Sequence, residues 1–383
     1  MRRQLLITTA VLALSIGSAF AADNSATISQ VGATGIVAEQ TQTGDTNVAN
    51  ITQNSAMGDG VTVNASQTQA GTGDFADIQQ SDSFFNQAVQ TQAGGPGNNA
   101  LITQTGPTSS QNLATQSQDG TGNLAQITQV TESSNNNASQ LQTGDGNLAA
   151  INQNSVSDSN LAMQDQSGTG NSATVNQNNI SFDNTATQVQ SGDTNIALIN
   201  QNDNSEDNIA AQDQDGTGNN ATINQNTFSS LNEADQTQAG DTHLATITQS
   251  DTSTGNIASQ TQDGTSNTAD ISQTLNSSFN VATQDQSGPN NIASIAQNDG
   301  STNNVADQVQ GGTGNNVASI VQNVLSDANT ASQIQTGDAN TAVIFQDNGA
   351  LGNTASQMQI GDGNTSSIFQ TGAFGSLATV VQN

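Results

Sequence analysis

The stretch NIAAQDQDGTGNNATINQN, residues 208–226, decides the fold because the chain repeats its pattern along almost its whole length. The repeated unit reads N-x-A-x-Q-x-Q-x-G-x-x-N-x-A-x-I-x-Q, and fourteen copies follow one another. The first Gln of each copy is at position 40, 67, 90, 116, 140, 164, 188, 212, 236, 260, 284, 308, 333 or 357. Between Gln116 and Gln308 the spacing is 24 residues every time, which indicates a repeat architecture.

Within each copy the fixed residues occupy alternate positions, which is the two-residue period of a β-strand. We therefore predict two seven-residue strands per copy, joined by a glycine turn and followed by a six-residue polar link. The variable positions between the fixed ones are predicted to face outward. In the copy that begins at Asn160, the predicted inward residues and the turn glycine form a representative ladder set: Asn160, Ala162, Gln164, Gln166, Gly168, Asn171, Ala173, Val175 and Gln177.

One strand-turn-strand unit cannot bury its inward face alone, but identical units that stack about 4.8 Å apart can. The stacked Asn and Gln amides would then donate and accept hydrogen bonds along the stack, so that each buried amide finds its partner in the next copy. The sequence thus predicts an all-β fold. It is a β-solenoid of about 14 strand-turn-strand repeats, with two packed parallel sheets and amyloid-like stacking.

The composition argues against several classes of protein. The 383 residues include 32 acidic residues and only two basic ones, Arg2 and Arg3, and aromatic residues make up 3%. Nucleic acids and anionic membranes are bound through cations, so we expect no nucleic-acid partner and no membrane insertion. Cys is absent, which excludes disulfide bonds and thiolate metal sites.

The N-terminal segment has the pattern of a secretory signal peptide. Arg2 and Arg3 precede an apolar run from Leu5 to Ile16, and Ala19-Phe20-Ala21 offers a cleavage site. A membrane anchor would need about 20 apolar residues. We therefore expect a signal peptide at 1–21 and a secreted chain. Its residues 22–383 should form a single solenoid domain, with a half repeat at 24–30, full repeats at about 36–370 and a half repeat at 376–382.

The residues suggest no catalytic, cofactor-binding or metal site. His243 is the only histidine and occupies a position that is usually Asn, and the chain has no Lys or Cys nucleophile. Calcium-binding solenoids use Gly-Asp turns, but their repeats are about nine residues long. We therefore interpret the acids that follow turn glycines as solvated, with calcium binding as the alternative: Asp45, Asp145, Asp193, Asp241, Asp338 and Asp362.

The run QDGTGNLAQITQ, residues 118–129, resembles the curlin repeat of curli fibre subunits, and the resemblance recurs in all fourteen copies. It implies an extracellular amyloid-like fibre subunit that acts in cell adhesion and biofilm matrix. It also implies export through an outer-membrane channel and a nucleating or major partner subunit. Which of the two subunits this chain would be stays open.

The alternative is a non-polymerising secreted solenoid that acts as an adhesin or ice-binding protein. Ice binding would favour a persistent row of outward Thr. Thr246 and Thr248 would begin one, but the preceding copy has Thr222 and Asn224 at these positions. No such row persists, which favours the fibre.

The half repeats at 24–30 and 376–382 are of opposite type. By its pattern, the half repeat at 24–30 corresponds to the second strand of a copy and lacks the first strand. The half repeat at 376–382 corresponds to the first strand of a copy and lacks the second strand. Open strand edges recruit other chains. We therefore expect head-to-tail contact between copies of the chain, in which the two halves complete one rung. The predicted junction residues are Asn24, Ala26, Ile28, Gln30, Ser376, Ala378, Val380 and Gln382.

Overall fold

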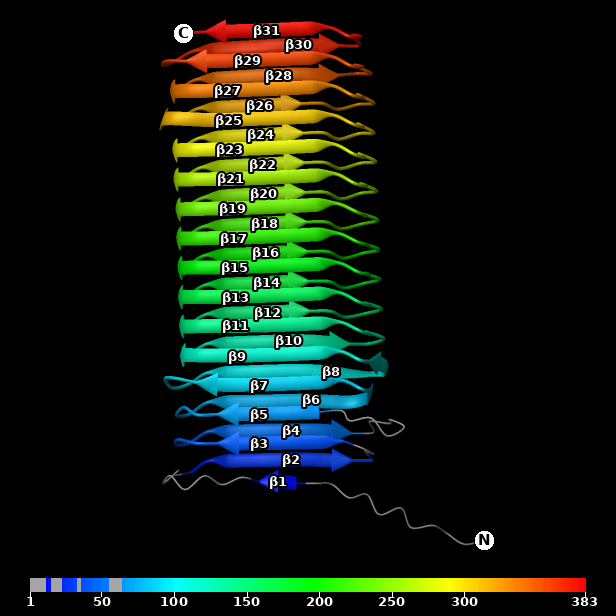
Figure 1. Ribbon diagram of the computed structural model, residues 1–383, viewed down its shortest axis with the longest axis vertical. Coiled ribbons are helices and arrows are strands. Elements are labelled where there is room, and N and C mark those ends of the chain that lie inside the picture. Colours follow the sequence, from blue (N-terminus) through cyan, green and yellow to red (C-terminus); the bar gives the residue numbers. More distant parts are fainter. Residues whose placement is uncertain (1–11, 15–22, 33–35, 55–63) are drawn as a thin grey trace, which may run out of the picture. The chain divides into compact units, whose positions relative to one another are not determined.

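The computed structural model describes residues 12–14, 23–32, 36–54 and 64–383, and within them it contains strands and no helix. The described residues form two compact units, one up to Ser181 and the other from Phe182 to Asn383. Figure 1 labels the strands of both in chain order. Apart from β1 (Leu12–Leu14), the expected signal peptide at 1–21 lies outside the described residues.

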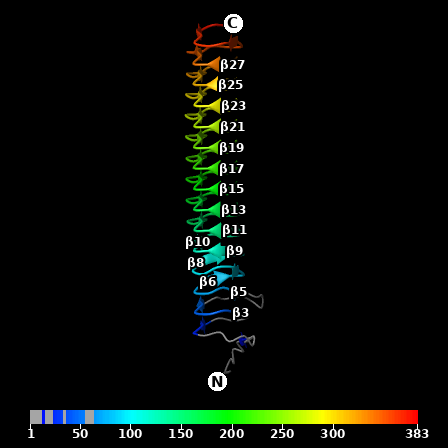
Figure 2. The same cartoon turned by 90° about the vertical axis from the view of Figure 1, so that its left-hand side faces the viewer.

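Each unit consists of two parallel sheets, sheet A from the odd-numbered strands and sheet B from the even-numbered ones. Figure 2 shows the odd-numbered strands along one side of each stack. In the first unit, sheet A contains β1, β3 (Val37–Gln42), β5 (Asn64–Gln69), β7 (Gln87–Ala93), β9 (Leu113–Thr121), β11 (Asn137–Asp145) and β13 (Leu161–Thr169). Its sheet B contains β2 (Ser25–Val31), β4 (Val48–Asn54), β6 (Phe75–Phe84), β8 (Asn99–Ser110), β10 (Leu124–Val130), β12 (Leu148–Asn152) and β14 (Ser172–Asn176).

The second unit repeats this arrangement. Its sheet A contains β15 (Thr185–Asp193), β17 (Ile209–Thr217), β19 (Glu233–Asp241), β21 (Ile257–Thr265), β23 (Val281–Pro289), β25 (Val305–Gly314), β27 (Thr330–Asp338), β29 (Thr354–Ile360) and β31 (Leu377–Gln382). Its sheet B contains β16 (Ile196–Asn200), β18 (Asn220–Asn224), β20 (Leu244–Thr248), β22 (Thr268–Ser272), β24 (Ile292–Ala296), β26 (Val317–Val321), β28 (Thr341–Asp347) and β30 (Thr365–Thr371).

Within each unit, successive strands of a sheet pair with each other, so that equivalent residues of successive copies lie side by side. Between β17 and β19, for example, Gln212 is opposite Gln236. Between β18 and β20, Ile223 is opposite Ile247. The prediction of an all-β solenoid with two parallel sheets and about 14 repeats is confirmed. The register follows from the repeat period, because a constant spacing places equivalent residues of successive copies opposite each other.

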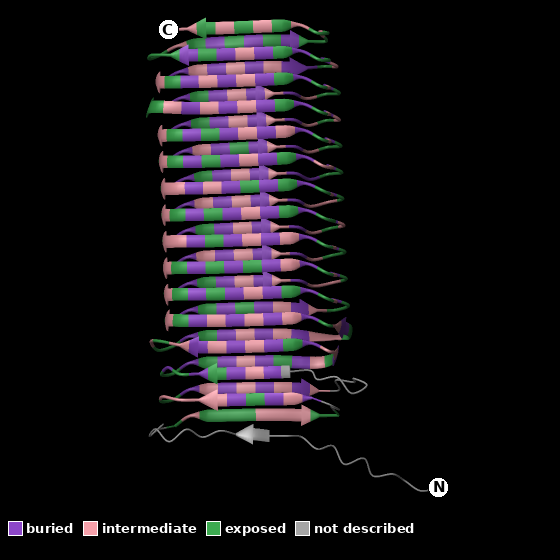
Figure 3. Ribbon diagram, viewed as in Figure 1, coloured by how far each residue is buried: buried purple, intermediate pink, exposed green. Residues whose placement is uncertain are grey.

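The core lies between the two sheets and is thin. Burial alternates along the strands, as Figure 3 shows, since every second side chain points inward. Ala210 of sheet A and Ala221 of sheet B are 1% and 0% exposed, and Ile223 is 0% exposed. Small Ala side chains allow the sheets to approach closely, while a column of Ile fills the centre of the layer.

The prediction of two seven-residue strands per copy is wrong for most copies. In a regular copy the first strand, such as β17, has 9 residues and the second, such as β18, has 5. The first is longer because pairing continues through the turn, where Gly216 (φ +117°) lies opposite Gly240 and a Cβ on Gly216 would collide with the Gly240 carbonyl oxygen. The second ends at Asn224, although the Gln225 N–H still donates to the Asn200 carbonyl (2.8 Å) and the Gln225 side chain stays buried.

Candidate functional site

The inward Gln side chains of sheet A connect successive copies and also connect the two sheets. Gln212 donates from Nε2 to Oε1 of Gln236 (2.9 Å) and to the carbonyl oxygen of Leu198 in sheet B (3.1 Å). Gln214 makes the same two kinds of bond on its own ladder. A side-chain amide has two N–H donors, and here both are used. These residues can therefore be buried at no loss of hydrogen bonding.

Sheet B has a third Gln ladder, at the end of each copy. Gln225 donates from Nε2 to Oε1 of Gln249 (2.9 Å). The same nitrogen approaches the carbonyl oxygens of Ile209 (3.0 Å) and Asn232 (3.1 Å), which belong to sheet A and to the link before it. This amide ties together the two ends of the link, so the link needs no apolar core of its own.

The Asn that begins each second strand bonds to the turns. Oδ1 of Asn195 accepts the backbone N–H of Asn219 (2.9 Å). Nδ2 of Asn219 donates to the carbonyl oxygens of Asp215 in its own turn (3.2 Å) and of Gly240 in the next turn (2.9 Å). This position thus requires an acceptor that points toward the next copy and a donor that points into the turns.

The links contain a buried Ser that the sequence reasoning missed. In the regular copies these Ser side chains are fully buried. Each Oγ accepts a hydrogen bond from Nδ2 of the Asn that begins the copy before the link, as in the bond from Asn208 to Ser229 (3.2 Å). The signal that could have found them is their spacing of 24 or 25 residues: Ser133, Ser157, Ser181, Ser205, Ser229, Ser253, Ser277, Ser301 and Ser326. The predicted polar link is therefore partly core.

The structure brings the representative ladder set together on one inward face. Eight members are between 0% and 2% exposed: Asn160, Ala162, Gln164, Gln166, Asn171, Ala173, Val175 and Gln177. Gly168 is half-buried in the turn with φ +104°. The outward neighbours Met163 and Asp165 are exposed.

In one copy of the first unit the turn-facing Asn is replaced by Asp74. Its Oδ1 accepts the N–H of Asn98 (2.9 Å), as an Asn would. Its Oδ2 is buried and has no hydrogen-bond partner among the described residues, since an ionised carboxylate cannot donate to the turn carbonyls. Burial raises the pKa of the Asp74 carboxyl above its usual 3.8, although hydrogen bonds from Asn98 and Gly97 oppose this effect.

In one copy of the second unit the same position holds His243, which is 1% exposed. Nδ1 accepts the N–H of Asn267 (3.2 Å), and Nε2 lies 3.1 Å from the carbonyl oxygen of Ala239. These partners assign the proton of the neutral ring to Nε2. Burial lowers the pKa of His243 below its usual 6.5, while the Ala239 and Gly264 carbonyls and the carboxylates of Asp263 and Asp241 oppose this shift.

The turn acids take part in bonds between copies. Oδ1 of Asp145 accepts the backbone N–H of Thr121 (3.0 Å), and Oδ1 of Asp241 accepts that of Thr217 (3.2 Å). Among the residues that the structure describes, no group of three or more His, Cys, Asp or Glu side chains could hold a metal ion. These bonds to neighbouring turns give Asp145 and Asp241 a structural role.

At the N-terminal end, β2 is the outermost strand of sheet B and pairs only with β4. Asn24, Ile28 and Gln30 are half-buried, and Gln30 donates from Nε2 to Oε1 of Gln53 (2.7 Å). Ala26, which was predicted to point inward, is exposed. The neighbouring copy covers these residues from one side only.

At the C-terminal end, β31 is the outermost strand of sheet A and pairs only with β29. Ser376, Ala378, Val380 and Gln382 are all half-buried, whereas their counterparts within the stack are buried. Gln382 accepts Nε2 of Gln359 (2.9 Å) and so continues its ladder. Strand β31 lies in sheet A, like the first strand of each copy, and β2 lies in sheet B, like the second strand of each copy.

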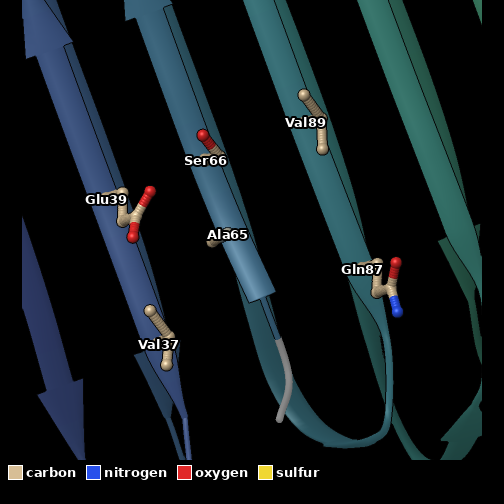
Figure 4. A pocket seen from close by; sticks show the side chains of 6 residues that line it. All are labelled: Val37, Glu39, Ala65, Ser66, Gln87 and Val89. Carbon is tan, nitrogen blue, oxygen red and sulfur yellow. The ribbon is translucent and has the colours of Figure 1, made fainter.

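A shallow depression lies on the outer face of sheet A across β3, β5 and β7 (Figure 4). Its lining includes Val37, Glu39, Ser66, Gln87 and Val89. Glu39 is the one titratable side chain in this lining, and no nucleophile activated by a base is present there. The depression offers nothing on which to build a catalytic site.

No protein-family model matches the chain, and no curated protein matches it significantly. None of the described residues belongs to a helix that is long and apolar enough to span a membrane.

Proposed function

We propose that this chain is a secreted structural subunit that self-assembles into extracellular, curli-like amyloid fibres for cell adhesion and biofilm matrix. The observation that carries the proposal is the partial exposure of the inward residues of β31, the outermost strand of sheet A. This strand has the inward pattern of an interior strand, yet Val380 and Gln382 are half-exposed because a neighbour covers them on one side only. Such an edge is a template for another chain. In this proposal the main partner is a second copy, placed head to tail, while the nucleating or major partner subunit and the outer-membrane channel follow from the resemblance to curlin repeats.

Fibre diffraction on purified, aged protein tests the proposal. Stacked copies predict reflections near about 4.7 Å and about 10 Å. A solution that stays monomeric under all conditions would contradict the fibre and favour the non-polymerising adhesin or ice-binding protein.

A matched pair of variants tests the edge itself. Val380→Lys places a charge at an inward position of β31, a device that protects natural edge strands from pairing. Val381→Lys places the same charge on the exposed outer face of the same strand. We expect Val380→Lys to prevent fibre formation and Val381→Lys to permit it, as measured by thioflavin fluorescence and electron microscopy. Equal assembly of the two variants would show that this edge is not used.

Charge should control the rate of assembly. Removal of Arg2 and Arg3 would leave 32 acidic residues and no Lys or Arg. Burial and then the neighbouring Asp215 raise the pKa of Asp213, and burial followed by Glu233 and Asp213 raises the pKa of Asp235. Since stacking brings such acids together, conversion to β-structure should be faster at high salt or toward the sequence pI of about 4.1. Kinetics that do not change with salt or pH would contradict this.

A further inference from the structure

The Gln ladders have a direction. In sheet A of the first unit, Gln40 donates from Nε2 to Oε1 of Gln67 (2.8 Å), and Gln67 donates in the same way to Gln90 (2.9 Å). In the second unit, Gln333 donates to Gln357 (2.9 Å), again toward the C-terminal end. A ladder of this kind begins with an unused acceptor and ends with an unused donor. The two ends of a stack are therefore chemically different.

The acceptor end lies at the leading edge, which we define as residues 24–30 and 36–42 on the side away from β4 and β5. Gln40 is 2% exposed, and its Oε1 has no hydrogen-bond partner among the described residues. Strand β1 borders this edge, but its register puts Leu14, which has no amide, opposite Gln40. A buried acceptor without a partner is unfavourable, because it has lost its hydrogen bonds to water. The leading edge thus lacks a donor.

The donor end lies at the trailing edge, which we define as residues 364–370 and 376–382 on the side away from β28 and β29. Gln370 accepts Nε2 of Gln346 (2.7 Å), but its own Nε2 reaches only the backbone oxygens of Thr354 (3.3 Å) and Ser376 (3.2 Å). These ladders stop because no further Gln follows among the described residues.

We propose that the trailing edge of one chain docks on the leading edge of a second copy in the register of the repeat. This inference rests on the proposed self-assembly and specifies its joint. Continuing the β28–β30 register by one rung places Ile28 of the second copy on Ile368 and Gln30 on Gln370. Gln370 then donates to Gln30, and the ladder passes from chain to chain in one direction.

Strands β31 and β3 form the other half of the joint, which is imperfect. Gln382 meets Gln42 and continues its ladder. Val380, which pairs with Gln357 in β29, meets Gln40 and offers no amide. Gln40 Oε1 thus stays without a donor at every joint, which makes the joint weaker than a regular rung. Docking also requires that β1 leave β3, as removal of residues 1–21 would ensure.

Disulfide trapping tests the register, since the natural chain contains no Cys. Thr27 of β2 and Ser367 of β30 are exposed outward residues that the proposed register places opposite each other. Paired residues at a strand spacing of about 4.8 Å lie within disulfide range. We expect oxidised fibres of the chain from residue 22 carrying T27C and S367C to yield covalent oligomers longer than dimers on non-reducing gels.

The control for this trapping pairs T27C with S319C, an outward position on β26 inside the second unit. This pair and each single variant should give no oligomers beyond dimers. Equal cross-linking in the control, or none in the test pair within intact fibres, would overturn the proposed joint. If the unmodified chain forms no cross-β fibre, it is the proposed function that fails.

The imperfect joint can be repaired by Val380→Gln, which restores the residue of the repeat. The monomer concentration left in equilibrium with fibres should fall roughly fivefold, the factor that one net hydrogen bond gives. Val381→Gln, on the outer face of the same strand, should leave that concentration unchanged. Equal values for the two variants, with unchanged circular dichroism, would overturn the role of Val380.

Discussion

Two copies, one in each unit, carry a different residue at the turn-facing Asn position, and only one of these residues replaces the hydrogen bonds of the amide. Asp74 keeps the acceptor that this position needs but lacks the donor, so that Oδ2 is left without a partner among the described residues. His243 keeps both functions, since Nδ1 accepts the N–H of Asn267 and Nε2 faces the carbonyl oxygen of Ala239. The neutral imidazole is thus a working substitute for the amide, whereas the ionised carboxylate is not.

This difference shows what the ladder selects. Size is secondary, because Asp has the shape of Asn and the His ring is larger. The required feature is one acceptor and one donor in an uncharged group. Protonation therefore has opposite effects: it gives Asp74 the donor that it lacks, and it removes the acceptor of His243.

Loss of the amide in a regular copy should have the largest effect. Asn219→Ala removes the acceptor of the His243 N–H and the donor to the turn carbonyls of Asp215 and Gly240. Each buried group without a partner costs about 1–3 kcal/mol, so we expect the free energy of unfolding to fall by about 3 kcal/mol. Asn220→Ala, one residue further and outward, is the matched control and should change it little. Denaturant titration followed by circular dichroism measures both, and equal losses would show that the inward and outward assignment is wrong.

Repair of the Asp74 copy should have the next largest effect. Because its folded pKa is raised, the stability that the protonated carboxyl provides is complete below 3.8 and is lost as the pH rises through the folded pKa. Asp74→Asn should therefore raise the free energy of unfolding by about 2 kcal/mol at pH 7 and by much less below pH 4. Asp77→Asn, an outward change in β6 of the same copy, is the matched control. A gain at Asp74 that is the same at both pH values would contradict the explanation.

The His243 copy should show the opposite pH dependence. Because its folded pKa is lowered, the stability of the neutral ring is complete above 6.5 and is lost as the pH falls through the folded pKa. His243→Asn should match the natural chain at pH 8 and exceed it by about 1 kcal/mol at pH 5, where protonated Nδ1 can no longer accept the Asn267 N–H. Unfolding midpoints at the two pH values measure this difference. A constant difference would show that the pKa of the ring is the same in the folded and the unfolded chain.

Much of the fold could be predicted because each fixed residue type has one function in the stack. Alternation indicated strands, and constant spacing indicated their register. The strand lengths were wrong because pairing through Gly216 depends on the neighbouring Gly240, and a pattern within one copy does not contain that contact. The turn-facing role of Asp74 and His243 also became clear only when the Asn219 bonds to two successive turns were known.

The links were the least predictable part. Val156 and Ile180 have φ values of +63° and +64°, a region that β-branched residues rarely adopt. Their sequence signals no such turn, because Gly, Asn and Asp are the residues that favour it. The fixed height of each rung, together with the buried Ser157 and Ser181 on the same links, imposes this conformation. Stacking therefore overrides local preference here.

The smallest expected effect comes from an exposed acid, which completes the comparison with the buried Asp74. Thr217 lies at a turn. Its backbone N–H donates to Oδ1 of Asp241 in the next copy (3.2 Å), and both residues are exposed. Thr217→Asp would place a second carboxylate about one strand spacing from Asp241. We expect the free energy of unfolding to fall by less than about 1 kcal/mol at low salt, because water screens surface charges. The loss should disappear near 1 M salt, where the screening length is about 3 Å.

Thr217→Asn, which has the same shape without the charge, should show no loss at either salt concentration. Since Asp74 is buried, salt should not reproduce the gain of Asp74→Asn. A loss at Thr217 that persists in 1 M salt would show that the turns, like the ladder, reject the acid for a reason other than charge repulsion.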